Sequence, residues 1–539
     1  MSDPNAKTPN GADPTTGDGR SQVLRAAGLV GAAVLLSRLV GLVREVVTRG
    51  YLGLTLEATA YEIANRFPEA IFLIIAGGAI GSAFIPTFAA YFAREDEAGA
   101  WRLFSAVINL LLVVVTAVAA LTMLLAPQFV IFFFAENVAG NPALLDLTVR
   151  LMRIMLVSPI IFGVSGVIMG ALNARQHFLL PALAPTVYNL GIIAGAVVGA
   201  RAGAGAVNGL AFGTVVGALG HLLIQLPGLR WKAARYTAVF SLRDPGVRQV
   251  LRLMAPRVLG LSFSEINKFI ILFLTGAMPL ATLPALNTAF RLIIMPQGII
   301  GQALGIAAFP TLAALAARAA YDEMRQIITD SLRLLLFLGI PVSVLFLLLR
   351  EPVIVILFQR GLFDAASTDL VSWALLFYTV GLVALLALEV IARAFYALSD
   401  TLTPVLAGGV QVLFMAILSL WLRDVVFPWL GWQPLGGLAL GFSLSNFLEV
   451  GLLLWLLRRK MGRLNGRELL DGLWRMGLAG LLMAGAMEAL LAQFSAGAVW
   501  TRLLVGSAGG GAVYLAASAL LRVQELQRLA AHGRRRLKR

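Results

Sequence analysis

Long apolar runs recur along almost the whole chain, and they constrain its fold more than any other feature. Stretches of about 18 or more apolar residues are long enough to cross a bilayer as helices. Only 13% of the residues are charged, against about 25% in soluble domains. The sequence therefore predicts an all-α polytopic membrane protein with about fourteen transmembrane helices. The candidate spans are 22–45, 66–91, 103–126, 146–172, 181–203, 206–228, 249–277, 284–316, 326–349, 368–397, 403–422, 435–458, 468–492 and 499–522.

Lysine and arginine concentrate in alternate loops between these spans. If the N-terminus is cytoplasmic, the basic loops fall on the cytoplasmic side, as the positive-inside rule requires. The opposite loop at 278–285 contains neither lysine nor arginine. We therefore expect both termini in the cytoplasm, with residues 1–20 as a disordered N-terminus and 523–539 as a basic tail. The net charge of +15 favours anionic membrane lipids over nucleic acid as partners.

The chain also contains an internal repeat. Pro86 and Pro310 begin similar Pro-Thr-x-Ala-Ala segments that are 224 residues apart. Three further pairs are separated by 223–225 residues, namely Arg102 and Arg325, Pro127 and Pro352, and Pro181 and Pro404. Because the period contains an even number of helices, the two copies have the same orientation in the membrane. We predict two six-helix lobes, an N-lobe at 21–230 and a C-lobe at 245–460, followed by two C-terminal helices at 465–522.

Ionisable residues inside the predicted spans are few. Such residues are costly in a bilayer and indicate a functional site by default. Arg38, Arg44 and Glu45 lie near the end of the first span, and Arg66 begins the second. Two other pairs have the spacing of local ion pairs on one helix face, and they are Glu265 with Lys268 and Glu389 with Arg393.

Arg291 differs from these pairs because no acidic residue is near it in the sequence. Arginines of the two lobes are predicted to meet in a central cavity. A guanidinium group is always charged and binds phosphate through two parallel hydrogen bonds. This favours an anionic substrate that carries phosphate or pyrophosphate. The alternative is that the arginines extend separately to the membrane surface.

The sequence offers no motif that is typical of an enzyme. It contains no P-loop and no HExxH motif, it lacks cysteine, and its three histidines are scattered. Two-lobed repeats are instead common among transporters that work by alternating access. We expect no catalysis, no metal and no cofactor.

Six segments, distributed from the first to the eleventh predicted helix, form a joint pattern. They are Ser37–Glu45 (SRLVGLVRE), Ala83–Pro86, Pro181–Thr186 with Asn189, Arg291–Gly298, Leu357–Phe363 and Phe395–Pro404. In this order they resemble the MurJ/MviN family, the proposed lipid II flippases of the multidrug/oligosaccharidyl-lipid/polysaccharide exporter superfamily. The count of fourteen helices is similar to that family as well.

The resemblance implies a cavity lined by helices one, two, seven and eight. Arg38, Arg44 and Arg291 would hold the pyrophosphate of an undecaprenyl-linked precursor, with Glu45 beside them. The last two helices would form a groove for the lipid tail. Arg66 would substitute for a family arginine at Phe72 or Leu73, and Thr59 stands where the family often has an acidic residue.

We therefore predict a monomeric, multi-pass lipid II flippase of the bacterial cytoplasmic (inner) membrane. Its substrate would be the lipid-linked cell-wall precursor. Some relatives bind sodium through acidic residues in helices seven and eleven, but the span 403–422 has no acidic residue, which argues against sodium coupling. Two alternatives stay open: another polysaccharide-lipid or drug exporter of the superfamily, and a non-transporting scaffold of the cell-wall machinery.

Overall fold

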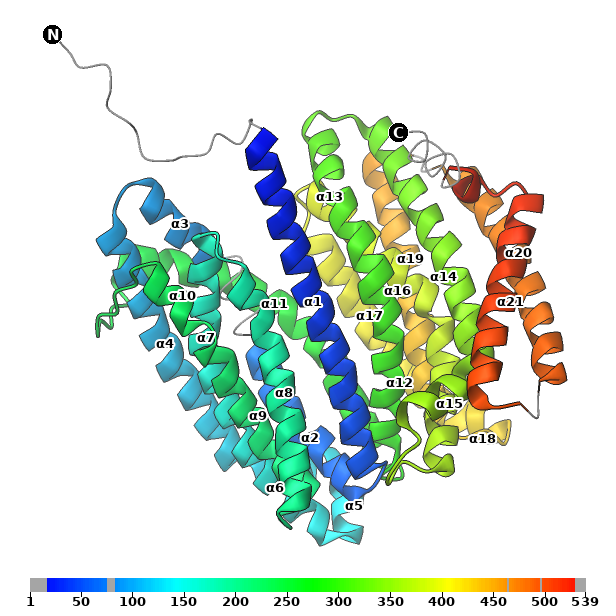
Figure 1. The fold of residues 1–539 in the computed structure, drawn as a ribbon, viewed down its shortest axis with the longest axis horizontal. Coiled ribbons are helices and arrows are strands. Elements are labelled where there is room, and N and C mark those ends of the chain that lie inside the picture. Colours follow the sequence, from blue (N-terminus) through cyan, green and yellow to red (C-terminus); the bar gives the residue numbers. More distant parts are fainter. Residues whose placement is uncertain (1–16, 75–82, 463–464, 495–496, 529–539) are drawn as a thin grey trace. The chain divides into compact units, whose positions relative to one another are not determined.

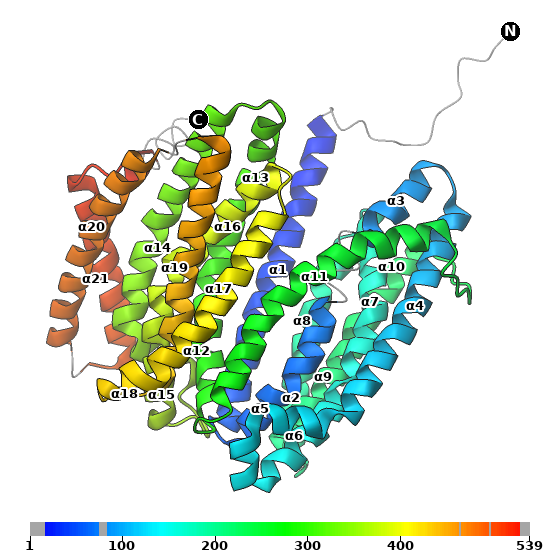
Figure 2. The same ribbon diagram turned by 180° about the vertical axis from the view of Figure 1, so that it is seen from behind.

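The computed structural model describes residues 17–74, 83–462, 465–494 and 497–528. These residues form helices, turns and loops without a β-strand (Figures 1 and 2). The all-α prediction is therefore confirmed. Helix α1 begins at Gly17, within the segment predicted as a disordered N-terminus. Residues 1–16 of that segment and residues 529–539 of the predicted basic tail lie outside the described residues.

The chain forms two compact units, and each is assembled from separate stretches of sequence. The first contains Met1–Thr48, Ile63–Phe129 and Asp146–Leu261, and the second contains Arg49–Glu62, Val130–Leu145 and Ser262–Arg539. The short stretch Arg49–Glu62, at the turn between the first two helices, thus belongs to the second unit. The lobe boundaries predicted from the repeat stay a prediction.

The first unit is built from the helices of the N-terminal half of the chain. These are α1 (Gly17–Leu52), α2 (Leu56–Phe72), α3 (Ile85–Ala93), α4 (Glu97–Leu124), α5 (Ala126–Gly140), α6 (Pro142–Met155), α7 (Val157–Ala174), α8 (Leu179–Arg201), α9 (Ala206–Leu223), α10 (Leu226–Trp231) and α11 (Pro245–Thr275). Helices α1, α2, α5, α6 and α11 also contribute residues to the second unit.

Within the first unit, α8 and α9 pack with their backbones in contact, side by side in Figure 1. Glycines recur every four residues on both facing surfaces, at Gly191, Gly195 and Gly199 on α8 and at Gly209, Gly213 and Gly217 on α9. A Cβ atom on Gly195 would lie 2.6 Å from the Cα atom of Gly213. Small residues allow this close approach between helices in a bilayer.

The second unit contains the remaining helices. These are α12 (Thr282–Pro296), η2 (Gln297–Gly301), α13 (Gln302–Ala317), α14 (Tyr321–Phe358), α15 (Ala365–Val380), α16 (Leu382–Ala397), α17 (Leu402–Trp421), η3 (Leu422–Val426), α18 (Phe427–Trp429), α19 (Leu435–Met461), α20 (Gly466–Gln493) and α21 (Val499–Leu520).

Two predicted spans of the second unit are not continuous α-helices. The span predicted at 284–316 contains the π-helical turn η2 directly after Pro296, which cannot donate a backbone hydrogen bond and so disturbs the helical ladder. The span predicted at 368–397 is bent by 45° between α15 and α16. Both breaks add a change of direction that apolar periodicity alone does not reveal.

The last two helices pack against α14 (Figure 2). Their shared core contains Phe337 of α14, three methionines of α20 and Tyr514 of α21, whose hydroxyl donates to the Phe337 carbonyl at 2.9 Å. Beside this core, Arg333 of α14 forms a buried ion pair with Glu525 at 2.6 Å. The described residues directly after α21 are thereby fixed to α14.

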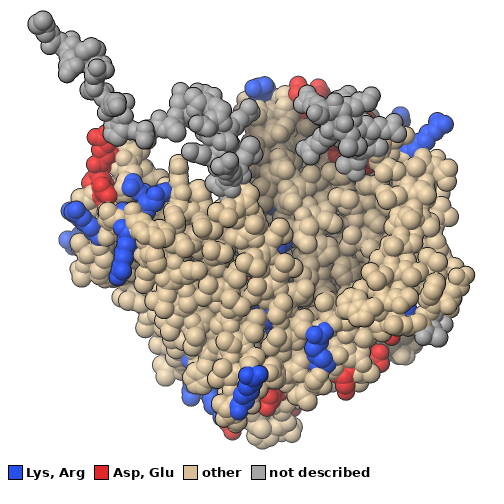
Figure 3. Space-filling view, viewed as in Figure 1, with Lys and Arg blue, Asp and Glu red and all other residues tan. Residues whose placement is uncertain are grey.

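Ten helical segments in the described part of the chain are long and apolar enough to cross a membrane, or eleven if the bent pair α15 and α16 is one span. Helices α1, α2 and α11 are not among them, so the predicted count of fourteen is not confirmed. On the face shown in Figure 3, charged side chains gather mainly toward the ends of the helices, and the surface between them is largely uncharged. Many large apolar side chains of the spans are exposed. The chain is a multi-pass membrane protein.

Candidate functional site

The site residues predicted from the sequence belong to both units. Arg38, Arg44, Glu45 and Arg66 lie in the first unit, and Arg291 lies in the second. Their assembly around one ligand therefore stays a prediction. Each group can nevertheless be described by its contacts within its own unit.

In the first unit, Arg44 is oriented by a neighbouring helix. Its Nη1 donates a hydrogen bond to the Oδ1 of Asn189 on α8, over 3.0 Å. Gly41, one turn earlier on α1, lies next to this amide, since a Cβ atom there would be at ordinary contact distance, 3.6 Å from the Asn189 Nδ2. Arg38 is exposed and Glu45 is buried. This hydrogen bond directs the guanidinium group of Arg44 toward α8.

Arg66 forms a local contact on α2. Its Nη1 lies 3.4 Å from the Oε2 of Glu69, three residues later, and its buried Nε has no hydrogen-bond partner among the described residues. The carboxylate of Glu69 is considerably exposed while Arg66 is buried. The pair leaves part of the hydrogen-bonding capacity of Arg66 unused.

In the second unit, three polar side chains from two helices converge on one carboxylate of a third helix. Arg49 of α1 and Glu62 of α2 form an ion pair whose side chains are only 1% and 3% exposed. Asn287 of α12 donates from its Nδ2 to the Oε2 of Glu62 at 2.9 Å. Arg291, one turn further along α12, places its Nη2 3.4 Å from both carboxylate oxygens and is 35% exposed. We call Arg49, Glu62, Asn287 and Arg291 the Glu62 cluster.

Backbone contacts hold the turn between α1 and α2 within the second unit. The N–H of Leu362 donates to the carbonyl of Gly50 at 2.9 Å. The hydroxyl of Thr59 donates to the carbonyl of Leu280 at 2.6 Å. Gly53 has a φ of 56°, a conformation that glycine adopts with little cost. These contacts determine where Arg49 and Glu62 lie.

The Glu62 cluster corrects one inference from the sequence. Arg291 was expected to lack an acidic partner, and this is wrong, because Glu62 lies beside it although it is 229 residues away in the chain. The two local pairs are confirmed. Lys268 lies 2.8 Å from Glu265, and Arg393 lies 2.5 Å from Glu389.

Sequence analysis missed Arg49, Glu62 and Asn287 as members of a site. Arg49 was placed beyond the first span, but α1 continues to Leu52 and carries this arginine one turn past Glu45. Glu62 follows Thr59 by three residues, which places both on one face of α2. That spacing is the signal that could have found Glu62.

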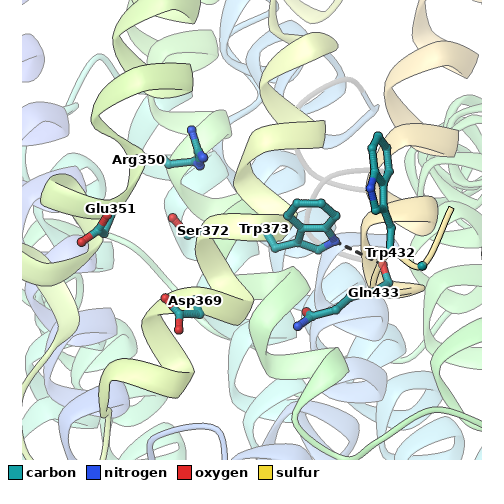
Figure 4. A pocket seen from close by; sticks show the side chains of 8 residues that line it. Arg350, Glu351, Asp369, Ser372, Trp373, Trp432 and Gln433 are labelled. Atoms are coloured by element: carbon teal, nitrogen blue, oxygen red, sulfur yellow. Dashed lines mark hydrogen bonds between the residues drawn. The ribbon is translucent and has the colours of Figure 1, made fainter. Parts of the chain in front are cut away.

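A cavity of about 360 Å³ lies elsewhere in the second unit and contains none of these residues (Figure 4). It is lined by Arg350, Glu351, Asp369, Ser372, Trp373, Gly431, Trp432 and Gln433. Trp373 donates from its Nε1 to the carbonyl of Gln433 at 3.1 Å, the bond drawn in Figure 4. In the described part of the chain, no group of three or more His, Asp or Glu side chains is arranged to bind a metal.

Comparison with protein families assigns the chain. The family model described as "Lipid II flippase MurJ" matches residues 49–506, most of the 539 residues. The chain belongs to the MurJ family. The recognition made from the six sequence segments is thereby confirmed, and the matched region includes the complete Glu62 cluster.

Individual relatives agree with this assignment. The chain is 29% identical over 485 residues to the probable lipid II flippase MurJ of Vibrio cholerae, covering 89% of this chain and 90% of that protein. The structure of a lipid II flippase MurJ in an inward closed conformation has a similar fold, with a TM-score of 0.74 and 24% identity over 91% of this chain and 98% of that one.

A second solved structure has a similar fold at lower sequence identity. The inward-facing structure of a multidrug resistance transporter of the MATE family has a TM-score of 0.68, with 15% identity over 82% of this chain and 99% of that chain. The MurJ family comprises transporters of the bacterial inner membrane, which agrees with the prediction of a non-enzymatic, multi-pass membrane protein.

Proposed function

We propose that this chain is a lipid II flippase that moves the lipid-linked peptidoglycan precursor from the inner to the outer leaflet. The match of the MurJ family model over residues 49–506 carries this proposal. The relative from Vibrio cholerae, which is described as a probable lipid II flippase MurJ, aligns with this chain over 90% of its own length. The chain would act as a monomer, without a cofactor, and its basic segments would contact anionic lipids.

Arginines are proposed to bind the pyrophosphate of the precursor. Arg44 donates a hydrogen bond to Asn189, and Arg291 is 35% exposed and lies 3.4 Å from the carboxylate of Glu62. A guanidinium group that is oriented or only loosely paired is suited to phosphate oxygens, which it binds in a bidentate manner. Arg38, Glu45 and Arg66 would complete the site.

Alternating access would move the bound headgroup across the membrane. Parallel repeats commonly surround a central site that faces one side of the membrane and then the other. An inside-negative membrane potential favours outward movement of the anionic headgroup by about 2.3 kcal/mol per charge per 100 mV. The membrane potential would therefore act in the direction of export.

The proposal is tested by two measurements on the same variants. Arg38→Ala, Arg44→Ala and Arg291→Ala are expressed in a bacterium depleted of its own flippase, and growth and precursor export are followed. The purified proteins are then titrated with labelled lipid II and with a neutral polyprenol. We expect each variant to lose binding and export, whereas Arg318→Ala, an exposed arginine at the end of α13, should behave as the wild type.

The outcomes separate the parts of the proposal. If all three variants still bind lipid II and support growth, the arginine site is wrong although the chain is a flippase. If the wild-type protein neither binds lipid II nor supports export, the chain is not a flippase, and the scaffold alternative is favoured.

A further inference from the structure

We propose that Glu62 is an exchangeable counter-ion for Arg291, which the diphosphate of the substrate displaces when it binds. This inference rests on the proposed function and adds a positioning residue to the site. In the absence of substrate, the carboxylate of Glu62 holds the position next to Arg291 that a phosphate group would take. Binding and release then become an exchange between two anions.

The geometry of the Glu62 cluster distinguishes a firm contact from a loose one. Arg49 and Glu62 are both almost completely buried, and Asn287 binds the second carboxylate oxygen at 2.9 Å. These two partners keep Glu62 in place. Arg291 is 3.4 Å from each carboxylate oxygen and is 35% exposed, so its contact with Glu62 is the longest in the cluster and the most accessible to a ligand.

The charges of the cluster fit such an exchange. Arg49 and Arg291 contribute two positive charges and Glu62 one negative charge, so these groups together remain cationic. A diphosphate carries more negative charge and more acceptor oxygens than one carboxylate, and it can bind a guanidinium group in a bidentate manner. It can therefore compete with Glu62 for Arg291 while Arg49 keeps its buried counter-ion.

An exchangeable counter-ion also serves release. A transport site must bind its substrate strongly enough to admit it and weakly enough to release it. If Glu62 returns to Arg291 when the diphosphate departs, one negative charge replaces another beside the arginine, and a partly buried charge is less costly when it is paired. Glu62 thus lowers affinity in order to allow turnover.

The test compares binding with export for Glu62→Gln in the full-length protein. The probe is a fluorescent short-chain polyprenyl diphosphate, with the matching neutral polyprenol for comparison. Because the competing charge is removed, we expect the affinity for the diphosphate to rise about tenfold, while export in depleted cells slows. Glu62→Asp should restore part of the wild-type balance. A purely structural ion pair predicts lower stability without tighter binding.

A matched control is available in the same unit. Glu525→Gln makes the same chemical change in another buried ion pair, that with Arg333. It should lower thermal stability and leave diphosphate affinity unchanged. The double variant Arg49→Gln/Glu62→Gln removes both buried partners without changing the net charge of the cluster, so it remains informative if Glu62→Gln fails to fold. It should also bind the diphosphate more tightly than the wild type.

The inference is overturned if the wild type binds the diphosphate and a folded Glu62→Gln or double variant binds it equally or more weakly. The proposed function would remain intact in that case. If the wild type does not bind the diphosphate lipid, the proposed function fails and the counter-ion role fails with it.

Discussion

At the scale of single residues, Asn189 is expected to set the direction of Arg44. The amide oxygen of Asn189 accepts from Arg44 at 3.0 Å in a buried position on α8. A hydrogen bond to a charged group contributes about 1.5–3 kcal/mol. Asn189→Ala should therefore weaken the binding of labelled lipid II by about tenfold, because the guanidinium group is no longer held toward its ligand. Titration of the purified variant measures this loss.

The matched control is Asn208→Ala on α9, since Asn208 is only partly buried and its amide donates locally, to the carbonyl of Ala204 at 2.7 Å. This control should bind lipid II as the wild type does. Equal affinities of Asn189→Ala and wild type would show that Arg44 is oriented by other groups.

Prediction of individual contacts from the sequence succeeded where the partners are close in the chain. The pairs Glu265–Lys268 and Glu389–Arg393 follow from helical spacing, which brings residues three or four apart together. The contact between Glu62 and Arg291 spans 229 residues, and periodicity identifies a helix face without identifying the helix that covers it. The family pattern directed attention to Thr59, whose hydroxyl instead binds the carbonyl of Leu280.

At the scale of helices, the glycine contact between α8 and α9 should be sensitive to a single methyl group. A Cβ atom on Gly195 would lie 2.6 Å from the Cα atom of Gly213, so the helices must separate in Gly195→Ala. Overpacking of this kind costs about 1–3 kcal/mol. We expect a lower melting temperature in detergent, measured by the loss of monodisperse protein on heating.

Gly477→Ala on α20 is the matched control, because no atom lies within 4 Å of a Cβ atom placed there. Alanine is favoured over glycine in a helix by up to about 1 kcal/mol, so this variant should be as stable as the wild type or more stable. Equal destabilisation of both variants would contradict a special role for the α8–α9 contact.

The loop between α16 and α17 should give the protein a measurable dependence on acid. Asp400 accepts from the backbone N–H of Thr403 at 3.0 Å and from its hydroxyl at 2.5 Å, and it pairs with Lys460 at the end of α19. Partial burial raises the pKa of Asp400, but these hydrogen bonds and the charge of Lys460 outweigh it and lower the pKa to about 2.

Because the folded pKa of Asp400 lies below the usual value of about 3.9, its contribution to stability is present above about pH 4 and is lost as the pH falls toward about 2. Asp400→Asn should therefore melt at a lower temperature than the wild type at pH 6, and the difference should shrink as the pH falls below 4. Melting curves between pH 7 and pH 3 measure it. Glu136→Gln, an exposed carboxylate on α5, should show no such difference, and a constant difference for Asp400→Asn would contradict the role of its charge.

The helices themselves were largely predictable, and their interruptions were not. Apolar length located most spans within a few residues, since burial in lipid requires a continuous apolar helix. The π-helical turn after Pro296 and the bend between α15 and α16 depend on packing against neighbouring helices. The first predicted span ends at residue 45, whereas α1 continues to Leu52, and the buried ion pair of Arg49 with Glu62 lies in this additional stretch.

At the scale of the whole molecule, the family was the property that the sequence predicted best. The six segments quoted from the sequence predicted the MurJ family, and the family model matches residues 49–506. The division into two units also depends on short segments that belong to a different unit from the residues on either side of them in the sequence, such as Arg49–Glu62. Contacts of that kind arise only in the folded chain, so the repeat alone does not give the boundaries of the units.

The orientation of the chain in the membrane remains to be tested, and its composition makes the test direct. The protein has no cysteine, so a single introduced thiol reports only its own position. Ala277 is exposed in the loop after α11, next to the stretch without lysine or arginine, and Ala238 is exposed in a loop that contains several basic residues. The positive-inside rule places the first outside the cytoplasm and the second inside. In intact spheroplasts, a membrane-impermeant maleimide should label Ala277→Cys and leave Ala238→Cys unlabelled until the membrane is permeabilised. The reverse labelling pattern would show the opposite topology and contradict the orientation predicted from the basic loops.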